Sequence, residues 1–443
     1  MTKQGQPDEQ HQDASSDVRR GANIITRRTM LVGTAGAVGG VLLKTATDAV
    51  QLVPSSSAAP RQVSPDPTKV QGRVPSELGQ RSPSEQPRRQ VGRALPSGES
   101  TTPLQDLDGI ITPADLHFER HHGGIPEIDP ERYALLIHGM VERPIKFTLA
   151  DLKRFSSSSR ICFIECSGNG FPGYHRQWSS KEMTPQQLDG LTSTSEWTGV
   201  MLSTLFREVG VRPGAKWFLA EASDAAVMTR SIPIEKAWDD AMIAYGQNGE
   251  AIRPEQGYPA RLLLPGWEGN AQVKWIRRIE VSDEPFMTRE ETSKYTDPLA
   301  NCTARLFSFV MDAKSTITFP AYPFALPGKG WWEIKGLAWS GRGHITRVDI
   351  STDGGRSWRP AELQAPVLPK CHTRFRYLWN WDGREALLMS RAVDETGYVQ
   401  PMLGDLVAAR GKGTFYHTNN IRPWKVQRDG QVFFAVDELF EGQ

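Results

Sequence analysis

One cysteine in this chain stands where its sulfur could bind a ligand. Residues 160–171 read RICFIECSGNGF, and the apolar run from Ile161 to Ile164 predicts a strand that ends in a turn at 166–170. Glycines in that turn would let a ligand approach Cys166 closely, and a thiolate there could bind a metal. The alternative is a small buried thiol that only packs. The segment by itself is compatible with both interpretations.

A second group of polar residues lies earlier, where His117, Arg120, His121 and His122 fall close together in the sequence HFERHH. Histidines at this density suggest zinc, but no second ligand cluster follows at the spacing of a zinc site. Arginine offers a planar fork that suits an oxyanion. A zinc site, an anion site and a solvated loop therefore all remain open for this segment.

Two cations further along, Arg261 and Lys274, are separated by glycine-containing turns. Such turns and two positive charges can hold a phosphate, although Lys and Arg are more often solvated. Tyr245, at the end of a predicted strand, is equally ambiguous because tyrosines there usually pack with a wet hydroxyl. No single one of these residues identifies a function. Only their combination and their order along the chain can do so.

Composition narrows the class of protein. The 443 residues have a formal net charge of +1, so no general attraction to nucleic acid or to an anionic membrane is expected. Four cysteines are too few for a disulfide scaffold. The sequence contains no CxxCH motif, so it carries no site for covalently attached c-type haem. The roles of Cys162, Cys302 and Cys371 stay open.

The N-terminal region predicts export. Arg27 and Arg28 precede an apolar run that ends at Leu43 and contains several glycines, and this run is shorter than the roughly 20 residues of a membrane span. The pattern resembles a twin-arginine signal, assigned to residues 1–59, and predicts a periplasmic protein. A short anchor or a chance basic pair is the alternative. Residues 60–104 are rich in Pro, Ser, Gln and Arg and predict a disordered linker.

Two folded domains are expected after the linker. Residues 105–295 interleave short strands and helices, including a helix at Leu202–Val209 with Ser203 as N-cap and Gly210 as stop, which predicts an α+β domain. Residues 296–443 contain alternating strands and a hairpin signal at 353–355, which predicts an immunoglobulin-like β-sandwich.

In combination, these motifs resemble the sulfite oxidase family of molybdenum-pterin enzymes over roughly residues 105–430. HFERHH is similar to the family's F-x-R-N-H, with His121 in place of asparagine, and CSGN is similar to its C-x-G-N. Tyr245 falls in a segment similar to A-Y-x-x-N-G. GYPAR at 257–261 with QVKW at 272–275 resembles the pterin-phosphate region, and AWSG, RVD and DGG at 338–355 resemble the dimerisation domain. The leader and the ECSGNG sequence are most similar to the molybdenum subunit of bacterial sulfane (sulfite) dehydrogenases of thiosulfate oxidation.

The resemblance implies roles for individual residues. Cys166 would be the sole protein ligand to molybdenum, and Arg120, Tyr245 and a second-domain arginine, Arg376 rather than Arg374, would be catalytic. Arg261, Lys274 and His122 would hold the pterin phosphate, and Asp224 a pterin amine. The residues expected to contact the molybdenum-molybdopterin cofactor are Phe118, Arg120, His121, His122, Cys166, Asp224, Gln256, Arg261, Gln272, Val273 and Lys274.

The sequence departs from the family pattern at two positions. Gly170 stands where an arginine usually follows C-x-G-N and helps bind the anion, and Gln256 stands where a phosphate-contacting histidine is common. We expect the lost charge at Gly170 to make room for a larger, carrier-bound sulfur species in preference to free sulfite.

The implied function is a periplasmic sulfane or sulfite dehydrogenase that oxidises sulfur by oxo transfer at molybdenum and passes electrons to a c-type cytochrome. The expected partners are that cytochrome, a sulfur-carrier protein and a second copy of the chain through the C-terminal domain, with a heterotetramer as one assembly. Neither nucleic acid nor a stable membrane span is expected. The alternatives are a free-sulfite dehydrogenase, a nitrate or sulfoxide reductase with the same fold, and an exported binding module without redox activity.

Overall fold

The computed structural model describes residues 66–69, 71–93, 97–299 and 301–441. The chain divides into two units, Met1–Gly79 and Gln80–Gln443. In the first unit, the described residues include the 3-10 helix η1 (Pro67–Lys69). The predicted export signal lies outside the described residues. Among the residues that are described, no helix is long and apolar enough to cross a membrane.

The N-terminal domain of the second unit is built on two sheets. The sheet that leads to the cysteine has the order β11-β10-β7-β6, and β12 also pairs with β10. Its strands are β6 (Ser158–Glu165), β7 (Thr192–Met201), β10 (Met242–Gln247), β11 (Glu250–Ala251) and β12 (Arg261–Leu263). The other sheet is β5 (Ile145–Thr148), β4 (Ala134–Gly139), β13 (Ile276–Ser282), β8 (Trp217–Ala222) and β9 (Thr229–Pro233), in that order.

Short helices connect these strands, and local sequence explains their ends. The helices are α2 (Leu149–Arg154), α3 (Pro185–Asp189), α4 (Leu202–Val209), α5 (Ile234–Asp239) and α6 (Arg289–Thr292). The predicted helix is confirmed as α4, and Gly210 ends it with a left-handed φ of 69°. The predicted N-cap is wrong: Met201 is the N-cap, and Ser203 lies inside the first turn. The apolar face of α4 packs into the domain core through Leu205, Phe206 and Val209.

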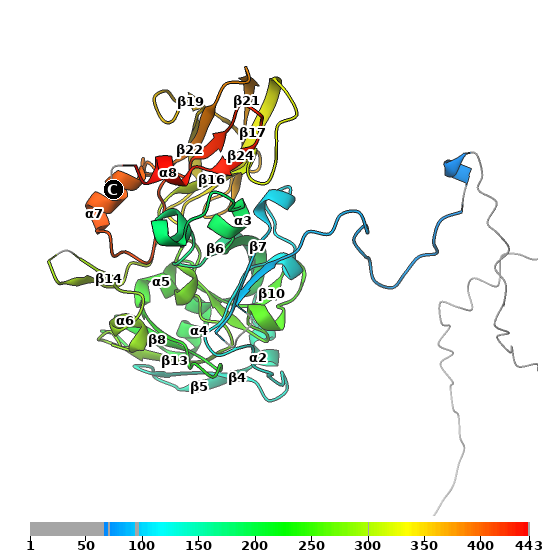
Figure 1. Cartoon of the computed structure of the whole chain (residues 1–443). Coiled ribbons are helices and arrows are strands. Elements are labelled where there is room, and N and C mark those ends of the chain that lie inside the picture. Colours follow the sequence, from blue (N-terminus) through cyan, green and yellow to red (C-terminus); the bar gives the residue numbers. More distant parts are fainter. Residues whose placement is uncertain (1–65, 70, 94–96, 300, 442–443) are drawn as a thin grey trace, which may run out of the picture. The chain divides into compact units, whose positions relative to one another are not determined.

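The C-terminal domain confirms the predicted β-sandwich, because its two main sheets are antiparallel and share one apolar core. One sheet is β16 (Lys314–Phe319), β17 (Gly330–Trp339), β21 (Thr373–Trp381) and β20 (Glu362–Gln364). The other is β19 (Arg359–Pro360), β18 (Ile345–Ser351), β22 (Ala386–Asp394), β23 (Trp424–Val426) and β24 (Val432–Phe434). The core between them includes Ile334, Val348, Phe375, Leu388 and Trp424. Figure 1 shows β6 and β7 between this domain and the sheet of β4, β5, β8 and β13.

Smaller elements complete the described chain. They are β14 (Asp297–Pro298), β15 (Ala304–Arg305), α7 (Leu403–Arg410), α8 (Val436–Leu439) and the 3-10 helices η2 (Leu104–Asp106), η3 (Ala114–Leu116), η4 (Phe171–Gly173), η5 (Arg176–Trp178), η6 (Pro254–Gln256) and η7 (Gly269–Ala271).

The expected linker contains regular structure at its C-terminal end. Strand β1 (Gln90–Arg93) pairs with β2 (Glu99–Thr101), and β2 pairs with β3 (Glu119–Arg120). Strand structure therefore begins at Gln90, inside the expected linker of residues 60–104. Composition did not predict these strands because β1 pairs with β2, and β2 is held by pairing with β3, which lies further along the chain. The pairing sets Arg120 opposite Glu99.

Candidate active site

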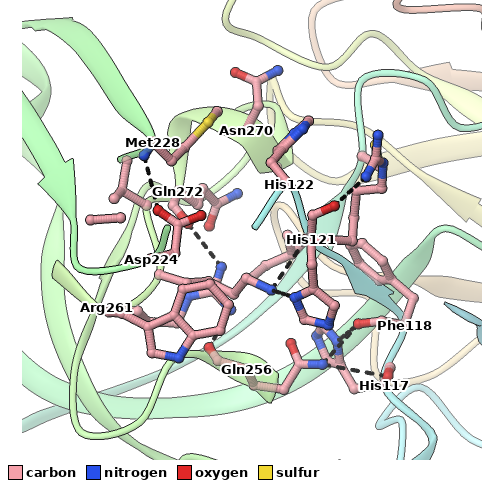
Figure 2. Close-up of a pocket in the computed structure, with 18 of the residues that line it drawn as sticks. His117, Phe118, His121, His122, Asp224, Met228, Gln256, Arg261, Asn270 and Gln272 are labelled. Atoms are coloured by element: carbon pink, nitrogen blue, oxygen red, sulfur yellow. Dashed lines mark hydrogen bonds between the residues drawn. The ribbon is translucent and has the colours of Figure 1, made fainter. Parts of the chain in front are cut away.

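A pocket in the N-terminal domain brings together every residue that the sequence predicted for the cofactor. It has an empty volume of about 660 Å³, which includes space open to solvent. Figure 2 shows His121, Asp224, Gln256, Arg261 and Gln272 around it. The full lining is His117, Phe118, Arg120, His121, His122, Ile164, Cys166, Ala222, Asp224, Met228, Gln256, Arg261, Gly269, Asn270, Gln272, Val273, Lys274, Trp275 and Tyr295.

Cys166 reaches this pocket because β6 ends at Glu165 and the chain then turns. The Asn169 N–H donates to the Cys166 carbonyl at 2.9 Å, and Gly170 has a left-handed φ of 88°. Burial raises the pKa of the Cys166 thiol, while the charge of Arg120 and the Gly168 N–H act in the opposite direction. A metal cation would displace the thiol proton, as metals do at coordinating cysteines. The sulfur is thus a suitable ligand in a site that also contains a cation for an anionic substrate.

The pocket wall offers two cations for an anion, the buried Arg261 and the partly buried Lys274. Arg261 is 3% exposed, and its guanidinium donates to the backbone carbonyls of Gln256 at 2.9 Å and Gln272 at 3.0 Å. Lys274 Nζ donates to His121 Nδ1 at 2.9 Å and to the Glu255 carbonyl at 3.0 Å. In the described part of the chain, no carboxylate lies within ion-pair distance of Arg261 or Lys274.

Burial disfavours the charged form of both cations, and the charge of Arg261 adds to the effect on Lys274. Burial, and then the charge of Arg261, lower the pKa of Lys274 well below its usual value. Burial lowers the pKa of Arg261 to about 9. The Nε of Arg261 is a buried donor that has no hydrogen-bond partner among the described residues. Two cations without carboxylate partners and an unsatisfied donor fit a phosphate group, which would supply both charge and acceptors.

Neighbouring polar residues complete the wall. The Gln256 side-chain amide donates to the Phe118 carbonyl at 2.8 Å, so Gln256 ties this wall to the HFERHH segment. Asp224 is 5% exposed, and one of its oxygens accepts from the Met228 N–H at 3.0 Å. Figure 2 shows the Asp224 carboxylate facing the pocket, where it could accept from an amine.

Tyr295 is a pocket residue that the sequence did not predict. Its hydroxyl lies 2.7 Å from His122 Nε2. Burial, with the charge of Arg120 next, lowers the pKa of His122 to about 3, so this histidine is neutral near pH 7. Burial raises the pKa of Tyr295, so its hydroxyl keeps its proton. No motif marks Tyr295, and its left-handed φ of 55° is visible only in the structure.

Two residues predicted to be catalytic lie elsewhere. Tyr245 sits at a bulge of β10 and packs against the core of the N-terminal domain, and it does not line the described pocket. Arg376, on the exposed side of β21, pairs with Glu362 at 2.6 Å. Arg374 instead donates to the carbonyls of Leu107 and Gly109. None of these three side chains is among the residues that line the described pocket.

The glycine at 170 does not open space for a substrate. A Cβ atom at Gly170 would lie 2.3 Å from Arg422 Nη2 and 2.8 Å from Lys314 Nζ. Both cations come from the C-terminal domain. The expected enlargement of the pocket is therefore wrong, because the volume that a side chain would fill is already occupied by Arg422 and Lys314.

Comparisons with known proteins agree with this architecture. Residues 122–290 match the oxidoreductase molybdopterin binding domain, and residues 307–423 match the Mo-co oxidoreductase dimerisation domain. The crystal structure of the sulfane dehydrogenase SoxCD from Paracoccus pantotrophus aligns with a TM-score of 0.80 and 45% identity, covering 84% of this chain and 97% of that chain.

Among curated proteins, the chain is similar to nitrate reductases. The NADH nitrate reductase 2 of Phaseolus vulgaris is 31% identical over 313 residues, which are 63% of this chain and 35% of that protein. The NADH nitrate reductase of Ulva prolifera is 29% identical over 313 residues, which are 62% of this chain and 34% of that protein. The chain thus spans about a third of the length of these relatives.

Proposed function

Because the chain belongs to the sulfite oxidase family of molybdenum-pterin enzymes, we propose that it is the molybdenum subunit of a sulfane or sulfite dehydrogenase. The observation that carries the sulfur specificity is the 45% identity to a sulfane dehydrogenase across 97% of the solved chain. The nitrate reductases are less similar, at 31% identity or below in the two examples above.

The pocket fits the cofactor that this family uses. Cys166 would hold the molybdenum, Arg261 and Lys274 the pterin phosphate, and Asp224 a pterin amine. When bound, the molybdenum-molybdopterin cofactor supplies a two-electron oxidation with transfer of an oxygen atom that derives from water. Residues of the chain orient the substrate and donate a proton to it.

Two groups act on the substrate. Arg120 lines the pocket with Cys166, and its guanidinium orients an anionic sulfur species through charge and paired donors. Tyr295 takes the role that the sequence gave to Tyr245. In the Nε2–H tautomer, neutral His122 donates to the Tyr295 oxygen, and the phenolic proton is then free to donate to a substrate oxygen.

Electrons then pass to a separate c-type cytochrome. The 443 residues contain no CxxCH motif, which supports a c-type haem acceptor outside them. Tyr295 contacts Tyr416 with ring centroids 5.1 Å apart, and Tyr416 is half-exposed, so aromatic contacts lead from the pocket toward the surface. The domain matched at 307–423 supports homodimerisation through the C-terminal domain.

Export to the periplasm by the twin-arginine route and a carrier-bound substrate also belong to this proposal. The first is supported by Arg27 and Arg28 before the short apolar run. The second rests on similarity to the sulfane dehydrogenase alone, because Gly170 does not enlarge the pocket.

Steady-state kinetics test the proposed reaction. We expect the molybdenum-loaded protein to reduce oxidised cytochrome c with a sulfane donor or sulfite, and to show at most trace nitrate reduction with a reduced dye. Presenting the same sulfur on a carrier protein and as free sulfite separates the two sulfur substrates. A faster reaction with nitrate than with any sulfur donor would overturn the proposal in favour of a nitrate reductase.

A further inference from the structure

Four buried charged residues meet behind the cysteine loop and join the two domains. We call Glu165, Asp189, Lys314 and Arg422 the interdomain ion cluster. Lys314 Nζ lies 3.1 Å from Glu165 Oε1 and 3.0 Å from Asp189 Oδ1, and Arg422 Nη2 lies 3.6 Å from Asp189 Oδ1. All four side chains are at most 2% exposed. The carboxylates belong to the N-terminal domain and the cations to the C-terminal domain.

The same cations hold the backbone of the loop that carries Cys166. Lys314 Nζ donates to the Asn169 carbonyl at 3.1 Å, and Arg422 Nη2 donates to the Gly170 carbonyl at 3.1 Å. Asn169 in turn donates from its side chain to Glu165 Oε1 at 2.9 Å. Two successive carbonyls of the loop are therefore bound by cations from the other domain.

Neutral groups of the C-terminal domain form further hydrogen bonds to the same segment. Thr418 Oγ1 also donates to the Asn169 carbonyl, at 3.1 Å, and the His417 N–H donates to the Ser167 carbonyl at 2.8 Å. Trp339 Nε1 donates to the other Glu165 oxygen at 2.6 Å. The segment from Glu165 to Gly170 is held at each end, and Cys166 lies within it.

The stability of the fold does not explain why the four residues of the interdomain ion cluster are charged. A buried ion cluster can often be replaced by apolar residues of similar volume without loss of stability, because desolvation offsets the attraction between its charges. What apolar side chains cannot supply is a set of directional donors to chosen carbonyls. The two cations and two carboxylates also balance, so the cluster adds no net charge to the pocket.

We propose that Lys314 and Arg422 are positioning residues for the Cys166 thiolate, so that docking of the C-terminal domain fixes the loop in the geometry that binds the metal. The proposal rests on the proposed function, because it takes Cys166 as the molybdenum ligand. It also accounts for the glycine at 170, since a side chain there would displace the Arg422 and Lys314 groups that hold the loop.

The test measures molybdenum per folded chain in purified full-length protein. We expect Lys314→Met to lower the molybdenum content per folded chain by about tenfold to a hundredfold. This is the usual effect of removing a group that orients a metal ligand. Lys425→Met is the matched control, since Lys425 pairs with Glu438 on the surface of the same domain at 2.8 Å. The metal–thiolate absorption band of the remaining loaded chains is expected to shift in Lys314→Met only.

A second variant separates positioning from folding. Lys314→Met combined with Asp189→Asn restores charge balance but not the donor to the Asn169 carbonyl, so we expect it to regain thermal stability and still hold little molybdenum. Lys314→Arg keeps a cation and hydrogen-bond donors at this position, so we expect it to hold more molybdenum than the double variant. Thr418→Val, which changes no charge, is expected to give a smaller loss in the same direction.

The outcomes decide between the two proposals. Wild-type molybdenum content in the double variant, or in Lys314→Met itself, would overturn the positioning role while leaving the proposed function intact. If the single variant does not fold, the double variant and Thr418→Val decide in the same way. Absence of molybdenum from the wild type and from Lys425→Met would overturn both proposals together.

Discussion

The pocket wall and the interdomain ion cluster each contain two cations, but only the cluster pairs them with carboxylates. Lys314 and Arg422 lie within 3.6 Å of carboxylates. Arg261 and Lys274 line the pocket with backbone carbonyls and a histidine as partners. Because a charge without a counter-ion in a protein interior is costly, this difference fits a ligand anion at the pocket cations, whereas the charges of the cluster cations are already balanced by carboxylates.

The largest expected effect is on the stability of the cluster. Arg422→Met would leave Asp189 with one cation instead of two in a fully buried site, and we expect a loss of about 3–5 kcal/mol in the free energy of unfolding. Arg261→Met, which removes a cation of similar burial that has no carboxylate partner, is the comparison variant. It loses the hydrogen bonds to the Gln256 and Gln272 carbonyls but leaves no carboxylate uncompensated, so we expect a smaller loss in cofactor-free protein. Chemical denaturation of both variants measures the loss in the free energy of unfolding. Equal losses would remove the distinction between the two pairs of cations.

The next effect concerns the chemistry of the pocket. We expect Tyr295→Phe to lower kcat by about a hundredfold, the contribution typical of a placed proton donor, with molybdenum content and stability unchanged. Tyr245→Phe is the matched control, since Tyr245 packs against the core outside the described pocket. A large loss in Tyr245→Phe and none in Tyr295→Phe would support the role that the sequence predicted.

A smaller effect is expected for pterin retention. Lys274→Met removes one of two cations that would bind the phosphate, and we expect pterin content to fall by about tenfold, in the range seen for groups next to a metal site. Cofactor-free protein should become no less stable, because the deleted cation has a pKa lowered by burial. Extraction of the pterin and measurement of its fluorescence give the pterin content. Undiminished pterin would place the phosphate elsewhere.

The remaining effect is a dependence of stability on pH. Burial, helped by the charge of Arg374, lowers the pKa of His372 to about 3, and burial also lowers the pKa of His117 and His122 to about 3. Between pH 6.5 and 3 the unfolded chain binds more protons than the folded chain, so the free energy of unfolding falls as the pH drops. Each histidine contributes a slope of at most about 1.4 kcal/mol per pH unit.

His372→Phe tests this contribution outside the pocket, because His372 stacks on Phe163 with an interplanar angle of 10° and a phenyl ring can do the same. Urea unfolding at about pH 7.5 and pH 5 should show a shallower decline in the variant. An identical decline in both proteins would mean that His372 titrates normally in the folded state.

Much of the site followed from the sequence because its parts are ordered along the chain. Cys166, Arg261 and Lys274 each carried an ambiguous signal, yet their order matched one family, and the structure brings them to one pocket. Helix α4 was predictable to the residue, since its apolar period and Gly210 are local signals.

What the sequence missed depends on contacts between distant segments. Arg120 is positioned by pairing with β2, which composition assigned to a linker. Lys314 and Arg422 look like solvated cations until their carboxylate partners, Asp189 and Glu165, are placed beside them by domain docking. Tyr295 has no motif, and its proximity to His122 arises only in the folded chain.

The central claim is that Cys166 holds the metal, and metal analysis tests it most directly. Full-length wild type, Cys166→Ser and Cys302→Ser are purified alike, with Cys302 as the control because it is an exposed cysteine. We predict molybdenum near one atom per chain in wild type and Cys302→Ser, and a loss of most of it in Cys166→Ser. Molybdenum retained at the wild-type level in Cys166→Ser would contradict the account.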